Sequence, residues 1–81
     1  MKVSVQFFAF LHDVTGVDRL DIDTRDHATV SDLFLQLVES YPSIAPFRSS
    51  LLIAVNEEYA PASRMLTSND RVALLPPVSG G

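Results

Sequence analysis

The amino-acid sequence predicts an α+β domain, with a mixed sheet of four to five strands and one main helix packed across it. Three observations support this fold class. Segments with strand patterns lie on both sides of one helical segment, in the order β-β-α-β-β. The helical segment has a single apolar face, and 81 residues leave room for only one domain. We expect the domain to span residues 1–75 and an extended tail to span residues 76–81.

Two strands are predicted before the helix. The first is expected over Lys2–Phe10, where side chains alternate as they do in a half-buried strand. Its second face begins polar but turns apolar at Phe8 and Phe10. A helical turn is expected over Leu11–Gly16, and a strand over Arg19–Thr24 should pair with the first as an antiparallel hairpin. The wholly apolar face of the first strand carries Val3, Val5, Phe7 and Ala9.

The helix is predicted to begin after Thr29. This residue suits the N-cap, and Asp32, three residues later, occupies the reciprocal position of a capping box. Pro42 disfavours helical backbone at Tyr41 and should end the helix there. Its apolar face, which should cover the sheet, consists of Val30, Leu33, Phe34, Leu37, Val38 and Tyr41.

Two or three short strands are predicted after the helix. Leu51–Val55 is continuously apolar, which is typical of a strand buried on both faces. A turn at Asn56-Glu57-Glu58 and a brief edge strand at Tyr59-Ala60 follow. A second turn is expected over Thr67–Asp70, and the last strand over Arg71–Leu75.

Composition and charge exclude several classes of function. The chain has no cysteine, which rules out disulfides, thiolate metal sites and a cysteine nucleophile. Its net charge is −4, and its six basic residues form no stripe of the kind that binds nucleic acid. We find no signal peptide and no apolar run long enough to span a membrane. We therefore expect a cytoplasmic protein that binds neither nucleic acid nor membrane.

The polar residues of the domain suggest no site of their own. His12 and His27 are interpreted as structural or solvated, because neither has an evident carboxylate partner. Asp21, Asp23 and Asp26 lack the glycine and the distal glutamate of a calcium loop. The arginines Arg48, Arg64 and Arg71 are interpreted as solvated or paired. We expect no metal and no cofactor to be bound by this chain, and no catalytic acid, base or nucleophile within the domain.

The tail is the most informative part of the sequence. Pro76 and Pro77 fix φ and lack N–H donors, so they end the sheet ladder and keep the exit extended. Residues 76–81 therefore reach roughly 20 Å from the sheet. Gly80 and Gly81 have no Cβ, so the tip can enter a channel too narrow for side chains.

Such a tip suggests acylation through the α-carboxylate of Gly81. This carboxylate is ionised at neutral pH and is a poor electrophile. Transfer of AMP from ATP would create a mixed anhydride with a good leaving group. Attack by a sulfide or persulfide would then leave a thiocarboxylate, which is a competent sulfur nucleophile. Since the chain has no cysteine, this sulfur must come from another molecule.

Three segments of the chain are distinctive: Phe7-Phe8-Ala9, Ala54-Val55-Asn56, and the run from Leu66 through Asp70-Arg71-Val72-Ala73-Leu74-Leu75 to Pro76-Pro77-Val78-Ser79-Gly80-Gly81. They resemble the small subunits of molybdopterin synthase, a family of ubiquitin-like sulfur carriers. The resemblance covers the chain in length and element order, and its most specific part is the ending. It implies a β-grasp (ubiquitin-like) fold. One departure is Asn69, where the family usually has glycine, but asparagine also tolerates left-handed backbone.

The resemblance also implies a function and partners. A ubiquitin-activating-type enzyme would use ATP to adenylate Gly81, and a sulfurtransferase would supply the sulfur. The thiocarboxylated tail would enter the large, catalytic subunit and donate sulfur to cyclic pyranopterin monophosphate. Two such transfers complete the dithiolene of molybdopterin during molybdenum cofactor biosynthesis. Members of the family usually assemble as heterotetramers of two large and two small subunits.

A partner surface is expected at the root of the tail. In a β-grasp sheet the first and last strands are parallel neighbours, so their C-terminal ends lie side by side. Phe8 and Phe10 should face away from the core, next to Ala73 and Leu75 of the last strand. The sequence therefore predicts an exposed apolar patch of these four residues, which a partner protein would cover.

Three other functions remain open on the sequence alone. A carrier of the same class could serve another pathway, such as thiazole synthesis, although such chains are usually shorter and lack the two prolines. A protein modifier would attach Gly81 to a lysine of a target through an isopeptide bond. A plain interaction module would carry the Gly-Gly ending without using it.

Overall fold

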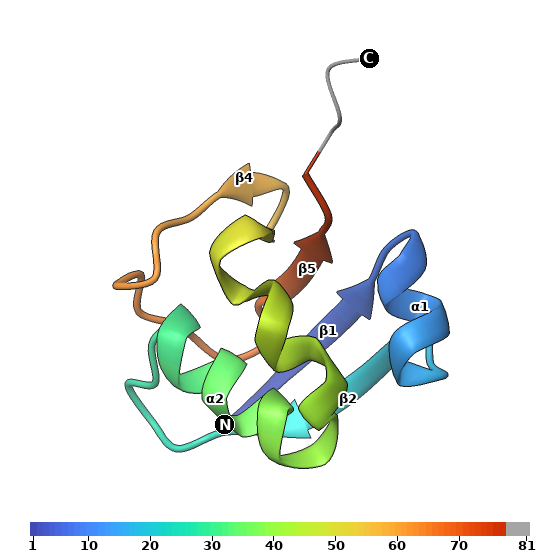
Figure 1. Ribbon diagram of the computed structural model, residues 1–81. Coiled ribbons are helices and arrows are strands. Elements are labelled where there is room, and N and C mark those ends of the chain that lie inside the picture. The colour runs from blue at the N-terminus through green and yellow to red at the C-terminus, as the bar shows by residue number, and fades with distance from the viewer. Residues whose placement is uncertain (78–81) are drawn as a thin grey trace.

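The computed structural model describes residues 1–77 and contains a five-stranded mixed sheet with one main helix across it, which confirms the predicted fold class (Figure 1). The strand order is β2-β1-β5-β3-β4. The elements are β1 (Lys2–Phe7), α1 (Phe10–Thr15), β2 (Arg19–Asp23), α2 (Val30–Ser40), the 3-10 helix η1 (Pro42–Ser50), β3 (Leu52–Val55), β4 (Glu58–Tyr59) and β5 (Arg71–Leu75).

The core lies between the sheet and the helical layer formed by α2 and η1, as Figure 1 shows. The predicted alternation of β1 and β5 is confirmed, because every second residue of both strands is buried. Burying one such aliphatic side chain stabilises the fold by about 1.5–3 kcal/mol. The buried core consists of Val3, Val5, Phe7, Leu11, Val30, Leu33, Phe34, Leu37, Ile44, Val55, Leu66, Val72 and Leu74.

The central strand β5 carries the exit of the chain. It pairs with β1 in parallel, as expected, and with β3 in the antiparallel sense. The pairing of Phe7 with Leu74 brings the C-terminal ends of β1 and β5 together. One residue further on, the N–H of Phe8 donates a hydrogen bond to the carbonyl of Leu74, at 3.1 Å.

The local signals around α2 and two turns are confirmed. Thr29 and Asp32 form the capping box, in which each side chain accepts a hydrogen bond from the backbone N–H of the other residue. The N–H of Thr29 is the main cause of a lowered pKa of the Asp32 carboxyl. Gly16 ends α1 with φ of 79°, and Asn69 adopts φ of 70° in the turn before β5.

The first strand is shorter than its alternation suggests. It ends at Phe7, not at Phe10, because the backbone reverses at Ala9, where φ is 52°. Phe10 therefore belongs to the first turn of α1. The strand pattern of the sequence continued past this point because Phe8 and Phe10 are residues that strands favour.

The segment after α2 contains a helix that the sequence did not reveal. Residues 42–50 form the 3-10 helix η1, with Pro42 in its first turn and Pro46 within it. Ile44 inserts fully into the core from this segment. Its period of about three residues per turn differs from the period of about 3.6 in α2, and a proline within a segment argues against a helix. The sequence pattern therefore does not indicate a helix here.

The expectation that Leu51–Val55 is buried on both faces is wrong for its first half. Leu52 is 39% exposed, whereas Ala54 and Val55 are buried. No element within residues 1–77 covers the outer face of the sheet at this point. The next strand, β4, begins at Glu58, one residue earlier than expected.

Within the described part of the chain, no helix is both long enough and apolar enough to cross a membrane.

Candidate functional site at the root of the tail

The root of the tail is held firmly by the sheet. Leu75, the last residue of β5, is paired with Leu52 of β3, and the end of β1 lies on the other side. Pro76 and Pro77 follow directly after this strand, and Figure 1 shows the chain leaving the sheet beside the end of β1. Because β5 is paired on both sides, the point at which the tail leaves is set by the central strand of the sheet.

The remaining tail residues of the predicted site are Val78, Ser79, Gly80 and Gly81. They lie outside the described residues, so their predicted roles stay predictions.

An apolar patch surrounds this root on the outer face of the sheet, which we call the open face. Phe8 is 37% exposed, and Ala73 and Leu75 are partly exposed. The sequence predicted these three, but the register adds two more. Leu52 lies opposite Leu75, and Tyr59 of β4, 72% exposed, lies opposite Ala54, which itself pairs with Ala73. We call Phe8, Leu52, Tyr59, Ala73 and Leu75 the tail-root patch.

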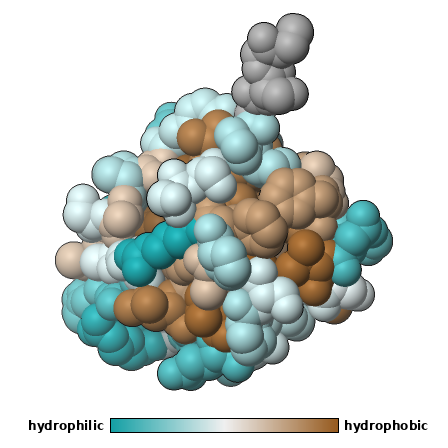
Figure 2. All heavy atoms as spheres, viewed as in Figure 1, coloured by the Kyte–Doolittle hydropathy of each residue, from teal (hydrophilic) through white to brown (hydrophobic). Residues whose placement is uncertain are grey.

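Phe10 lies elsewhere. Its ring packs edge-on against the ring of Phe47 in η1, with centroids 5.0 Å apart, although 38% of the residue remains exposed. It was expected next to Phe8 because the strand was expected to continue. The alternation ends at Phe7, so Phe10 joins the helical layer instead. Figure 2, which views the helical side, shows apolar surface between the polar side chains of this layer.

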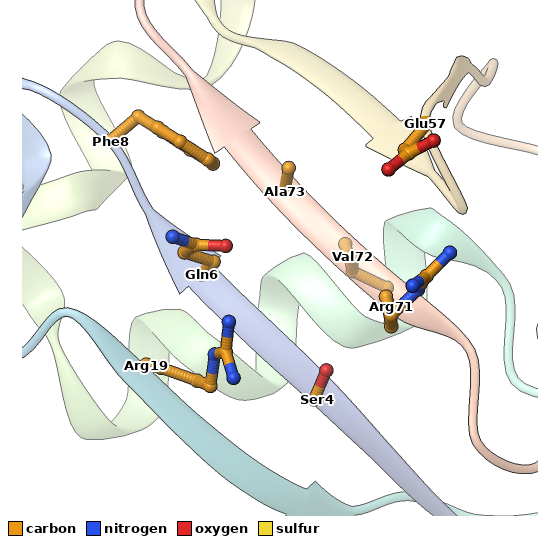
Figure 3. A pocket seen from close by; sticks show the side chains of 8 residues that line it. All are labelled: Ser4, Gln6, Phe8, Arg19, Glu57, Arg71, Val72 and Ala73. Atoms are coloured by element: carbon orange, nitrogen blue, oxygen red, sulfur yellow. The ribbon is translucent and has the colours of Figure 1, made fainter.

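A cavity of about 380 Å³ opens on the open face next to the patch. Figure 3 shows its floor, formed by β1 and β5, with Phe8 lying over Ala73 at one end. At the other end, polar and charged side chains from β1, β2, β5 and the β3–β4 turn project into it. The lining residues are Ser4, Gln6, Phe8, Arg19, Glu57, Arg71, Val72 and Ala73.

The start of β5 is fixed by the side chain of Asp70. Its carboxylate accepts hydrogen bonds from the N–H and the hydroxyl of Thr67 and from the side-chain amide of Asn56, at 2.8–3.0 Å. Burial on its own raises the pKa of Asp70. The hydrogen bonds from Thr67 and Asn56, with the nearby charge of Arg64, outweigh this effect and hold the pKa below its usual value.

The sequence suggested no carboxylate partner for either histidine, and for His12 the structure corrects this expectation. His12 lies near Asp13 and Asp18, at 3.6 and 3.4 Å, with all three side chains well exposed to solvent. His27 has φ of 65° in a loop. Among residues 1–77 no three histidine, aspartate or glutamate side chains are grouped so that they could hold a metal ion. What the described site offers is an apolar surface beside the point at which the chain leaves β5, at Pro76 and Pro77.

Comparison with known proteins identifies relatives over the whole chain. The model of the ThiS family matches residues 5–81. The chain is 33% identical to the molybdopterin synthase sulfur carrier subunit of Arabidopsis thaliana, and the match covers all of this chain and 84% of the relative. It is 38% identical to the protein of the same name from Dictyostelium discoideum, with coverage of 99% and 96%.

Solved structures of the same fold are also found. The small archaeal modifier protein SAMP1 from Haloferax volcanii matches with a TM-score of 0.89 and 28% identity, over all of both chains. A chain in the complex of subunits 1 and 2 of the molybdopterin-converting factor from Helicobacter pylori matches with a TM-score of 0.71. Its identity is 23% over the full length of both chains, and this likeness shows the fold alone.

Proposed function

This chain belongs to the ThiS family, and we propose that it is the sulfur-carrier subunit of molybdopterin synthase. The observation that carries the proposal is its full-length similarity to relatives of that name, up to 38% identical. The geometry agrees with this role. A stiff exit from the central strand and an exposed apolar patch at its root are what a protein needs to offer its C-terminus to partners.

The proposed chemistry takes place at the carboxylate of Gly81. An oxygen of the carboxylate attacks the α-phosphorus of ATP, pyrophosphate leaves, and an acyl-adenylate forms. A persulfide of the sulfurtransferase then attacks the carbonyl carbon and AMP leaves, which gives an acyl disulfide. A thiol attacks the donor's sulfur of this S–S bond, so that the thiocarboxylate is released and a disulfide forms on the donor side. The sulfur of the thiocarboxylate is donated to cyclic pyranopterin monophosphate, and two transfers complete the dithiolene. ATP is bound by the activating enzyme. This chain supplies the carboxylate that accepts first AMP and then sulfur, and the tail that carries it.

The proposal includes three protein partners. A ubiquitin-activating-type enzyme adenylates the tail, a sulfurtransferase provides the sulfur, and a large catalytic subunit accepts it. The word "subunit" in the names of the relatives supports the last of these. The reducing cytoplasm is the compartment that we propose, because it is where thiol-based sulfur donors persist.

Intact-mass measurement tests this function. The purified chain is incubated with an activating enzyme, ATP and a sulfur source, and is then added to the large subunit with cyclic pyranopterin monophosphate. We expect exchange of one oxygen for sulfur at Gly81, followed by formation of molybdopterin. A variant that lacks Gly81 is the control and should do neither. An unchanged mass of the full chain, or molybdopterin formation by the truncated control, would contradict the proposal.

A second function, protein modification, is favoured by one observation. The match to SAMP1 has the TM-score of 0.89 and spans both chains completely. A modifier would use the same acyl-adenylate but would pass Gly81 to the amine of a lysine on a target protein. Covalent adducts that persist in denaturing gels, and that disappear without ATP, would support this second role.

A further inference from the structure

Two arginines on the open face have no ion-pair partner within residues 1–77. Arg19 and Arg71 are exposed, and no carboxylate of the described chain lies within ion-pairing distance of either. Other arginines are engaged on the helical side of the molecule. Arg25 pairs with Asp32 at 2.6 Å, and Arg48 donates a hydrogen bond to the hydroxyl of Ser31. Within residues 1–77 the open face thus presents two guanidinium groups that are not engaged in an ion pair.

The sheet brings these two arginines to opposite sides of one strand. Arg19 of β2 lies opposite Gln6 of β1, and Arg71 of β5 lies opposite Ser4. Two strand spacings and an offset of two residues place their Cα atoms roughly 12 Å apart. In Figure 3 the guanidinium group of Arg19 points toward β1, and the polar side chains of Ser4 and Gln6 lie between the two strands that carry the arginines.

The cavity between the arginines suits an anionic group more than a cationic one. The net charge of the chain is −4, but the lining of this cavity contains two guanidinium groups and only one carboxylate, that of Glu57. The hydroxyl of Ser4 and the amide of Gln6 add hydrogen-bond donors. Guanidinium groups bind carboxylates in a bidentate fashion, and such charge-assisted bonds are stronger than neutral ones. Asp21 of β2, which lies opposite Ser4 of β1, adds a negative charge at the edge of this face.

The cavity is continuous with the tail-root patch, because Phe8 and Ala73 belong to both. A protein that covers the patch therefore reaches the arginines without a gap. The cavity is a depression on one face of the sheet, so the second wall that would exclude water must come from the partner. A large protein surface meets this requirement better than a free small anion does.

We propose that Arg19 and Arg71 bind a carboxylate of the large synthase subunit when that subunit docks on the open face. The apolar residues of the partner cover the tail-root patch, and an acidic side chain beside them enters the cavity between the two arginines. The inference rests on the proposed function and deepens it. In this inference, the contact between the two arginines and the carboxylate sets the orientation in which the large subunit docks, on the side of the sheet away from α2.

A double variant, Arg19→Gln with Arg71→Gln, tests the proposal. Its affinity for the isolated large subunit is measured by calorimetry at about 0.1 M and about 1 M NaCl, between which screening increases strongly. We expect a loss of about tenfold or more at the lower salt concentration, and a smaller effect of salt on the variant than on the original chain. The control is Arg25→Gln with Arg48→Gln, which changes the net charge equally on the helical side and should bind as the original chain does.

Several outcomes would overturn this inference. Equal affinity and equal salt dependence of the double variant and the original chain would do so, as would an equal loss in the control, which would reflect net charge alone. Inorganic phosphate that binds the original chain but not the double variant, with the affinity for the large subunit unchanged, would identify a small-anion site instead. Thermal melting confirms that both variants are folded.

The same variants separate this inference from the proposed function. If the double variant binds normally and Gly81 still becomes a thiocarboxylate, only the role of the arginines is wrong. If the original chain neither binds the large subunit nor gains sulfur, the sulfur-carrier function fails, and this inference fails with it.

Discussion

Phe8 is an aromatic residue at a position where the chain changes from strand to turn. Its N–H is bound to Leu74, so its backbone is fixed, while its ring lies over Ala73 on the open face. A small domain that exposes an aromatic ring on the same face as Leu52 and Tyr59 gains nothing from it unless another molecule covers the patch. Rigid aromatic anchors of this kind dominate the energy of protein interfaces.

Replacing Phe8 with aspartate should abolish binding to the large subunit. We expect a loss of about 2 kcal/mol or more, because a charge would have to be buried where a ring was covered. Surface plasmon resonance with the immobilised large subunit measures it. The matched control is Leu35→Asp on α2, since Leu35 is 52% exposed outside the tail-root patch. Affinity that is unchanged by Phe8→Asp would show that the patch is not an interface.

Asp70 makes a prediction about pH. Its pKa is lowered in the folded state, so its contribution to stability is complete above the unfolded value of about 3.9 and is lost as the pH falls through the folded pKa. Asp70→Asn should therefore destabilise the domain by about 1–3 kcal/mol at neutral pH, and the difference should shrink near pH ~3. Urea unfolding at both pH values measures it.

The control for this prediction is Asp13→Asn. The Asp13 side chain is 85% exposed, and within residues 1–77 its only neighbour of opposite charge type at ion-pairing distance is His12. Its replacement should therefore cost no more than about 0.5 kcal/mol. A difference between Asp70→Asn and the original chain that stays constant with pH would contradict the role of the Asp70 carboxylate.

At the scale of elements, the turn of the β3–β4 hairpin has an unfavourable backbone conformation that lowers the stability of the domain. Val55 pairs with Glu58, so the loop between them is Asn56-Glu57, and both residues have positive φ, at 52° and 74°. A two-residue loop of this kind favours Asn-Gly, because asparagine and glycine tolerate left-handed backbone. Asn56 also has a structural task, since its side chain joins Asp70 and the N–H of Arg71. Glu57 is the residue at which the sequence departs from the preferred turn.

Replacing Glu57 with glycine should raise the stability of the domain by up to about 1 kcal/mol, because it removes the cost of left-handed backbone at a residue with a Cβ. Differential scanning fluorimetry should show a higher Tm. The matched control is Glu58→Gly, one residue further on in β4, which should lower stability since glycine weakens a strand. A lower Tm for Glu57→Gly would mean that its side chain contributes more than its backbone costs.

At the scale of the whole molecule, the body and the tail have separate tasks. In the sequence, the buried core residues run from Val3 to Leu74. Leu75 forms the last residue pair between β5 and β3. Residues after Leu75 contribute no side chain to this core within the described part of the chain. The described core is thus complete without the residues that follow Leu75.

Truncation after Leu75 should therefore leave the domain folded. We expect a Tm within a few degrees of that of the full chain, because no core contact is removed, together with complete loss of thiocarboxylate formation. Circular dichroism and intact mass measure the two effects. The comparison is truncation after Arg71, which removes the buried Val72 and Leu74 and should unfold the chain. Unfolding of the longer fragment would show that the tail is part of the fold.

The elements that sequence reasoning identified depend on short-range physics. The capping box of Thr29 and Asp32, the left-handed turn at Asn69 and the inward faces of β1 and β5 follow from spacing within a few residues. Phe8, Ala73 and Leu75 could be assigned to the outer surface for the same reason. The parallel pairing of β1 and β5 was expected from the family resemblance, and the structure confirms it.

The sequence by itself determined the fold class, the helix, the faces of the two central strands and the chemically distinct tail, because each is encoded by local periodicity, caps or composition. Only the tertiary structure decided that β1 ends at Phe7, that Leu52 and Tyr59 join the patch, and that Arg19 and Arg71 flank one strand. These features depend on which strands are neighbours and in what register. Strand neighbours are chosen by packing over the whole molecule, and no local pattern records that choice.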